Sequence, residues 1–192
     1  ITSRDPAPPP ISYVKASGGI FMDMTIHDFD MARYLAGSEV TEVYAVGSVL
    51  IEPAIAEVGD YDSAVVVLKF ANQAVCVIDN SRKAVYGYDQ RVEVFGQKGS
   101  ATAYNKKPTD VEISTEQGVY TDKPLYFFLE RYMDSFRMEL CDFITAVTSN
   151  EEPPVTGEDG LHALYIAKAA AMSAGENRPV SIEEIEQSAL TP

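Results

Sequence analysis

Apolar and polar positions alternate in the middle of the chain in a pattern that predicts β-strands. Residues 61–71 and 74–82 are rich in β-branched side chains, and only Asn72 and Gln73 separate the two runs. Because Asn tolerates a positive φ angle in a tight turn, this spacing predicts a β-hairpin. The same kind of pattern predicts one more strand and two more hairpins, at residues 40–51, 91–104 and 111–121.

Elsewhere apolar residues recur at three- and four-residue steps, which predicts amphipathic helices. The first such segment spans residues 23–36 and is followed by Gly37, a common C-terminal cap. The second spans residues 129–147, and its apolar stripe is expected to be buried. Thr156 and Ser181 each precede a carboxylate by three residues, a capping-box pattern that predicts two further helix starts.

A helix, a run of strands and a final set of helices is the order of an α+β domain with a mostly antiparallel sheet. Both faces of the predicted strands are apolar, since Val66 and Leu68 lie on one face and Val65 and Val67 on the other. The predicted helices can cover only one face. We therefore expect homo-oligomerisation, as a dimer or tetramer, through the other face. Loops or a part of the protein outside this chain are the alternative cover.

Composition and charge narrow the possible partners. The chain has 192 residues, 46% of them hydrophobic, which is enough for one domain. Its formal net charge of -14 would repel a phosphate backbone, so no nucleic-acid partner is expected. No apolar run approaches the roughly 18 residues of a membrane span, and the start has no signal-peptide pattern. We expect a cytoplasmic protein without a membrane partner.

Several features indicate that part of the functional protein lies outside this chain. The sequence begins at Ile1 without a methionine, and its strand-like opening followed by Pro6 and Pro8–Pro10 predicts a fragment of a longer enzyme. The chain contains no GxGxxG, GxxxxGK[ST], GxSxG or HExxH motif. If the protein transfers hydride, its cofactor is therefore expected to be bound elsewhere.

The clearest candidate chemistry is an acidic and imidazole group in the helix predicted at residues 23–36. Asp23, His27 and Asp30 stand at positions i, i+4 and i+7, which places them within about 60° of arc on one face, whereas Asp28 points elsewhere. A carboxylate beside an imidazole suits a general base near neutral pH. Asp23 is expected at the helix start, where the macrodipole favours its charged form. The alternative is a hydrogen-bonded helix histidine with solvated aspartates.

The same three residues could instead ligate a divalent metal ion, because two carboxylates and an imidazole make a serviceable ligand set. Such a site needs a fourth protein ligand. His162 is the only other histidine, and packing at a helix start is its expected role. We therefore expect no metal.

A second candidate is the segment Tyr86-Gly87-Tyr88, in which two phenols flank a flexible glycine. Phenols offer hydrogen bonds and apolar ring faces to a polyhydroxylated ring. The alternative is a pair of strand tyrosines that pack on opposite faces.

Four segments give the sequence a family resemblance. The run Ser17-Gly18-Gly19-Ile20-Phe21-Met22-Asp23-Met24-Thr25-Ile26-His27-Asp28-Phe29-Asp30-Met31-Ala32-Arg33 closely resembles a signature of the Gfo/Idh/MocA oxidoreductases, and in particular of the inositol 2-dehydrogenases among them. The other segments are residues 86–96, 128–132 and 154–160. Essentially the whole chain is covered.

The resemblance implies that residues 1–192 are the C-terminal substrate-binding, catalytic and oligomerisation domain, an open-faced mixed sheet with helices on one face. An N-terminal Rossmann domain that binds NAD, absent from this chain, would precede it. The resemblance implies that Asp23 and His27 are catalytic, with His27 taking the hydroxyl proton of a polyol. It gives substrate contacts to Asp30, Tyr86 and Tyr88, and more loosely to Asp5. A catalytic lysine would belong to the absent domain.

The implied activity is oxidation of myo-inositol to 2-keto-inositol by NAD, with the isolated chain inactive. Ser3 departs from a histidine that some inositol dehydrogenases carry near this position, which leaves the polyol open. The alternatives are a related NAD(P)-dependent sugar or polyol dehydrogenase, and a non-catalytic polyol-binding or assembly module.

Overall fold

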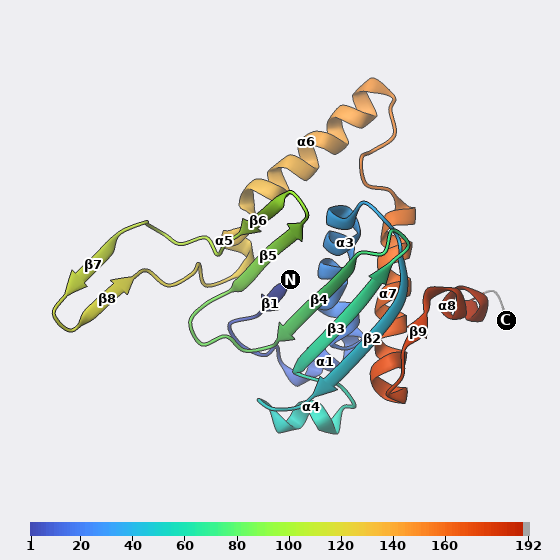
Figure 1. The fold of residues 1–192 in the computed structure, drawn as a ribbon, viewed down its shortest axis with the longest axis horizontal. Helices are drawn as coiled ribbons and strands as arrows, with labels where there is room; N and C mark the ends of the chain where they lie inside the picture. Colours follow the sequence, from blue (N-terminus) through green and yellow to red (C-terminus); the bar gives the residue numbers. More distant parts are fainter. Residues whose placement is uncertain (190–192) are drawn as a thin grey trace.

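The computed structural model describes residues 1–189, which fold as a mixed sheet backed by helices (Figure 1). The main sheet has seven strands in the order β6-β5-β1-β4-β3-β2-β9, and β7 pairs with β8 in a separate hairpin. The strands are β1 (Thr2–Arg4), β2 (Val40–Ser48), β3 (Ser63–Phe70), β4 (Val75–Ser81), β5 (Asp89–Gly96), β6 (Gly99–Ala103), β7 (Glu112–Thr115), β8 (Gly118–Thr121) and β9 (Val180–Ser181). Only the β1–β4 pair is parallel among them, so the fold is the expected α+β arrangement with a mostly antiparallel sheet.

All three predicted hairpins are confirmed. β3 pairs with β4 in antiparallel register, β5 with β6, and β7 with β8. In the first turn the residue with positive φ is Gln73, at 71°, and not Asn72. Asn72 stabilises the turn differently, because its side-chain oxygen accepts a hydrogen bond from the Ala74 amide at 3.0 Å.

The described residues contain eight helices: three precede β2, one lies between β2 and β3, and four follow β8. They are α1 (Ile11–Ser17), α2 (Ile20–Asp23), α3 (Thr25–Ala36), α4 (Pro53–Glu57), α5 (Phe128–Arg131), α6 (Met133–Ser149), α7 (Gly157–Glu176) and α8 (Ile182–Ala189). α7 begins at the predicted capping box of Thr156 and Asp159. α8 begins after Ser181, whose hydroxyl accepts a hydrogen bond from the Glu184 amide at 3.2 Å.

The core lies between one face of the sheet and helices α2, α3 and α7. Val66, Leu68 and Ile78 point to this side from the central strands, and Phe29 of α3 meets them, all completely buried. α7 contributes small alanines and Ile166, which let the helix approach the sheet closely. This packing fixes α3 against the centre of the sheet.

The opposite face of the sheet stays open and apolar, as the double-sided pattern predicts. Val65 is 47% exposed, and Val75 and Val77 are 65% and 53% exposed. No helix of the described residues covers this side in Figure 1.

The prediction that the apolar stripe in residues 129–147 is buried is wrong within this chain. α6 extends away from the sheet at one edge of the molecule, and only Ala146 on it is buried (Figure 1). Its apolar side chains are largely exposed, namely Met133, Phe136, Met138, Leu140, Phe143, Ile144 and Val147. Periodicity identified the apolar face correctly, but residues 1–189 leave its large side chains exposed.

The prediction of one continuous helix over residues 23–36 is also wrong. The chain forms the short helix α2 up to Asp23, turns at Met24 (φ -110°, ψ -59°) and starts again as α3 at Thr25. The buried Thr25 hydroxyl contacts the Ile20 carbonyl and lies 2.8 Å from Asn80 Oδ1 in β4. Asp23 therefore ends one helix and does not begin the other, which removes the predicted dipole effect at this residue.

Candidate active site

The parallel pairing of β1 with β4 brings two charged residues together at the carboxyl ends of these two central strands. Arg4 and Ser81 are register partners, so the residues that follow, Asp5 and Arg82, leave the sheet side by side. The Asp5 amide donates to the Ser81 carbonyl at 3.0 Å, and the Arg82 amide donates to the Asp62 carbonyl at 2.8 Å. These strand ends face the junction between α2 and α3.

Two side chains form hydrogen bonds with Asp23 at these strand ends. Its Oδ1 accepts a hydrogen bond from the Tyr13 hydroxyl at 2.6 Å, and its Oδ2 accepts one from Arg82 Nη1 at 3.0 Å. Arg82 is completely buried and also reaches Asp60 Oδ2 with Nη2 at 3.3 Å. No local sequence pattern marks Arg82 or Asp60, because they lie in separate loops that only the fold brings together.

Asp5 titrates unusually in this surrounding. Burial raises its pKa to about 6, and the nearby Asp23 and Asp28 carboxylates push it in the same direction. The Arg82 guanidinium and His27 oppose the shift. The pKa of Asp5 therefore depends on the charges of four neighbours, namely Asp23, Asp28, His27 and Arg82.

His27 is exposed, and no other side chain or backbone group in residues 1–189 forms a hydrogen bond with its ring. The direct Asp23–His27 bond considered from the spacing is not formed, since both Asp23 oxygens bind other groups. Asp5 and Asp28 lie close enough to His27 for its charge to affect their titration. An imidazole in this position is free to hydrogen-bond a ligand.

Asp28 holds the first turn of α3 in place. Its carboxylate is 2% exposed and accepts hydrogen bonds from Asn80 Nδ2 at 2.9 Å and Gln90 Nε2 at 3.0 Å. Burial raises the pKa of Asp28, and the two amide donors counter that shift. Asp28 points inward, off the face of His27 as expected, and the neighbouring His27 points outward.

Asp30 lies on α3 one turn beyond His27 and is half-exposed. Its Oδ1 is 3.3 Å from Arg33 Nη1, and Arg33 also binds Glu39 with two hydrogen bonds of 2.8 Å. Asp30 is thus oriented by an arginine and keeps surface available to solvent or a ligand.

The two predicted tyrosines lie in different places. Tyr88 is half-buried and makes an edge contact with Tyr132, with ring centroids 6.1 Å apart. Burial, Tyr132 and the charges of Asp5 and Asp28 raise the pKa of Tyr88, which places its phenol near the Asp5 group. Tyr132 was expected only as part of a buried stripe.

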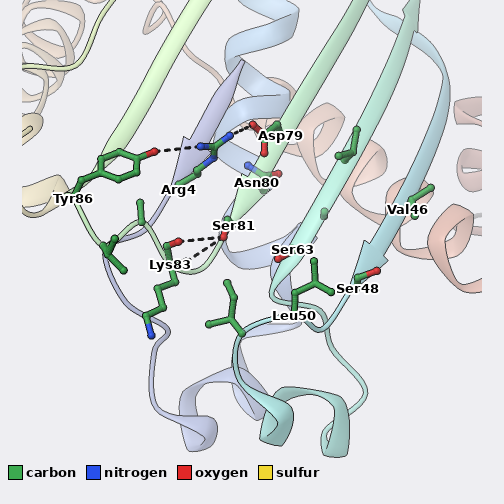
Figure 2. Close-up of a pocket in the computed structure, with 15 residues that line it drawn as sticks. Arg4, Val46, Ser48, Leu50, Ser63, Asp79, Asn80, Ser81, Lys83 and Tyr86 are labelled. Atoms are coloured by element: carbon green, nitrogen blue, oxygen red, sulfur yellow. Dashed lines mark hydrogen bonds and ion pairs between the residues drawn. The ribbon is translucent and has the colours of Figure 1, made fainter.

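Tyr86 points to the open side of the sheet (Figure 2). Its hydroxyl donates to Asp89 Oδ2 at 2.5 Å and accepts from Arg4 Nη1 at 3.2 Å. It lines an open cavity of about 500 Å³ together with Arg4, Asp79 and Lys83. Gly87, with φ 128°, lies between the two tyrosines and makes this change of direction possible.

The described residues contain no grouping of three His, Cys, Asp or Glu side chains arranged to hold a metal ion. His162 contacts Glu39 at 3.2 Å. The metal alternative therefore has no ligand geometry to support it in this part of the chain. Nor does any helix in residues 1–189 combine the length and apolarity needed to cross a membrane.

Comparison with known proteins identifies the family. A family profile described as "Oxidoreductase family, C-terminal alpha/beta domain" matches residues 3–182. The chain belongs to the Gfo/Idh/MocA oxidoreductase family. Within it, the chain is 62% identical to the uncharacterized oxidoreductase YrbE of Bacillus subtilis, over 99% of this chain and 56% of that protein. It is 59% identical to the myo-inositol 2-dehydrogenase of Thermotoga maritima, over 96% of this chain and 55% of that protein.

Solved structures of the Gfo/Idh/MocA family agree with the fold. A probable dehydrogenase from Thermotoga maritima superimposes with a TM-score of 0.94 at 59% identity, covering 96% of this chain and 55% of its own. A scyllo-inositol dehydrogenase from Lactobacillus casei, solved with bound NAD(H) and scyllo-inositol, matches with a TM-score of 0.85 at 28% identity, over 95% of this chain and 55% of its own. The chain thus spans about half the length of these relatives.

The residues of the candidate site do not fit the diphosphate of a dinucleotide. The site contains four carboxylates, those of Asp5, Asp23, Asp28 and Asp60. Both terminal nitrogens of the buried Arg82 already bind carboxylates. A negatively charged ligand group would be repelled here. Uncharged hydroxyl groups, in contrast, can donate to carboxylates and to an imidazole.

Proposed function

We propose that this chain is the C-terminal catalytic domain of an NAD-dependent inositol 2-dehydrogenase that oxidises myo-inositol to 2-keto-inositol. The observation that carries the proposal is His27, an exposed imidazole without a hydrogen-bond partner in residues 1–189, near Asp5 and the firmly held Asp23. The high identity to a protein named myo-inositol 2-dehydrogenase supports the substrate.

In this proposal His27 is the general base. Oxidation of a secondary alcohol removes the hydroxyl proton and a hydride from the same carbon, and the carbon becomes a carbonyl. The proton passes to the His27 imidazole, and NAD supplies the hydride acceptor. Asp23 is proposed to assist this proton transfer.

Asp5, Asp30 and Tyr88 are proposed to bind the remaining hydroxyl groups of the ring. Asp5, with its pKa of about 6, is mostly an ionised acceptor at neutral pH. Tyr88 offers both a donor and an apolar ring face. Tyr86 stays a predicted substrate contact for which this geometry offers no support, because its hydroxyl is engaged by Asp89 and Arg4 on the open side of the sheet.

We further propose that the cofactor is bound by a Rossmann domain in the part of the relatives that this chain does not cover. Tyr132, at the start of α6, contacts Tyr88 in the site, so the exposed stripe of α6 begins where the site begins. A domain docked on that stripe would reach the site and exclude water from it. The isolated chain is accordingly proposed to be inactive, and the complete enzyme to be cytoplasmic.

The open face of the sheet is proposed to bind a second copy of the chain. Val65, Val75 and Val77 form an apolar surface on neighbouring strands, and a symmetric pair of sheets would bury it. The sheet geometry is compatible with a dimer or with a tetramer built from such pairs.

The experiment joins the N-terminal part of the Bacillus subtilis relative to this chain and measures NADH formation with myo-inositol, scyllo-inositol and a set of sugars. The proposal predicts NADH formation with an inositol as the preferred substrate, and none from the isolated chain. Preference for another sugar would favour a related dehydrogenase. Polyol binding without NAD reduction would contradict catalysis and favour a binding module.

A further inference from the structure

Arg82 is the largest of the completely buried side chains in residues 1–189. A buried guanidinium loses its hydration and is kept in a fold only with charged partners. Here the partners are Asp23 at 3.0 Å and Asp60 at 3.3 Å, whereas Nε has no hydrogen-bond partner within the described part of the chain. The arginine is therefore oriented by its two carboxylates.

Asp60 is itself fixed by the backbone at the start of α2. Its Oδ1 accepts a hydrogen bond from the Ile20 amide at 2.9 Å. Gly19, with φ 86°, allows this approach, because a Cβ atom there would lie 2.7 Å from Asp60 Oδ1. Asp60 thus ties Arg82 to the same short helix that carries Asp23.

Tyr13 reaches Asp23 from the other side. It lies on α1, its side chain is 50% exposed, and its hydroxyl donates to Asp23 Oδ1 at 2.6 Å. This bond raises the pKa of Tyr13. Half of the ring faces solvent, so the hydroxyl adds little to the packing of the core.

We propose that Tyr13 and Arg82 are positioning residues for the catalytic carboxylate Asp23, an inference that rests on the proposed function. The helix is interrupted at Met24, so helical geometry does not set the direction of Asp23 relative to His27. One hydrogen bond to each carboxylate oxygen sets it instead. The two donors hold the Asp23 carboxylate in one orientation while His27 takes up a proton.

The central variant is Tyr13→Phe in the joined full-length enzyme, with Tyr34→Phe as the control. Tyr34 is 80% exposed on α3. We expect Tyr13→Phe to lower kcat roughly tenfold, the loss expected for one hydrogen bond to a charged group. KM for NAD and the melting temperature should stay constant, and the primary deuterium isotope effect on kcat should rise. The control should match the wild type.

Arg82→Lys keeps the positive charge but cannot contact Asp23 and Asp60 through two separate nitrogens. This variant should lower kcat by about 10²-fold. If this buried variant does not fold, Tyr13→Phe decides alone. Unchanged kcat in Tyr13→Phe, or a lower kcat accompanied by a lower melting temperature and a higher KM for NAD, would overturn the positioning role.

A measurement without turnover separates this inference from the proposed function. The pKa of Tyr13, followed by NMR of its labelled ring carbon, should fall toward the ordinary tyrosine value in Asp23→Asn. No change would overturn the Tyr13–Asp23 contact. A wild-type enzyme that shows this contact but oxidises no polyol would contradict the proposed function instead.

Discussion

Asn80 in β4 donates a hydrogen bond to the buried carboxylate of Asp28 at 2.9 Å, and this contact joins the centre of the sheet to the turn of α3 that presents His27. The two residues are 52 positions apart in the sequence. Because Asp28 and His27 are neighbours on the helix, the side that Asp28 anchors decides where the imidazole points.

Asn80→Ala is predicted to destabilise the chain. The change leaves a buried carboxylate without one of its two amide donors, which costs about 2–3 kcal/mol in the free energy of unfolding. Urea denaturation measures this loss of unfolding free energy. Ser114→Ala, at an exposed position in β7, is the control. A loss for Asn80→Ala no larger than that for the control would contradict the anchoring role.

Asp5 is predicted to make stability depend on pH. Its folded pKa of about 6 lies above its ordinary value of 3.8, so ionisation is less favourable in the folded chain than in the unfolded chain. The penalty is absent below pH 3.8, grows between pH 3.8 and 6, and is complete above pH 6, where it is at most about 3 kcal/mol.

Asp5→Asn should therefore raise the free energy of unfolding at pH 8 and leave it nearly unchanged at pH 4. Asp110→Asn, in an exposed loop, is the control. An equal effect of Asp5→Asn at both pH values would show that Asp5 is not destabilised by its surroundings.

The open face of the sheet is predicted to mediate self-association. Val65→Lys and Val77→Lys place charges on neighbouring strands of that face and should convert the oligomer to a monomer with unchanged circular dichroism. Sedimentation velocity measures this. Val111→Lys, at a position 59% exposed outside the main sheet, should leave the assembly intact. Assembly that survives both face variants would place the interface elsewhere.

The stripe of α6 is predicted to be covered only in the full-length enzyme. Ile144→Asp should cost little in the isolated chain, where this side chain is 57% exposed. In the joined enzyme it should remove about 1.5–3 kcal/mol of burial and lower the melting temperature. Val119→Asp on β8 is the matched control. Equal effects in the two proteins would contradict docking on α6.

The elements that the sequence predicted correctly depend on local signals. Asn72 and Gln73 between two β-branched runs specify a hairpin, and Thr156 with Asp159 specifies a helix start, whatever surrounds them. The alternation of Val65 and Val66 also predicted an uncovered apolar face, because strand geometry alone assigns each side chain to a side, although it did not say which face the helices cover.

The features that the sequence did not predict depend on distant contacts. The interruption at Met24 accompanies the contact of Thr25 with Asn80, and the Arg82–Asp23 pair joins the residue after β4 to the end of α2, 59 positions away in the sequence. Helical spacing alone therefore placed Asp23 on the wrong helix. Likewise, periodicity found the apolar face of α6 but could not say whether this chain contains its cover.

The most direct test of the account is the rate of NADH formation from myo-inositol by the joined full-length enzyme and its His27→Ala variant. The account predicts that His27→Ala lowers kcat at least about 10²-fold, the contribution expected of a general base, with the fold and the melting temperature preserved. A His27→Ala enzyme that turns over at the wild-type rate would contradict the central claim.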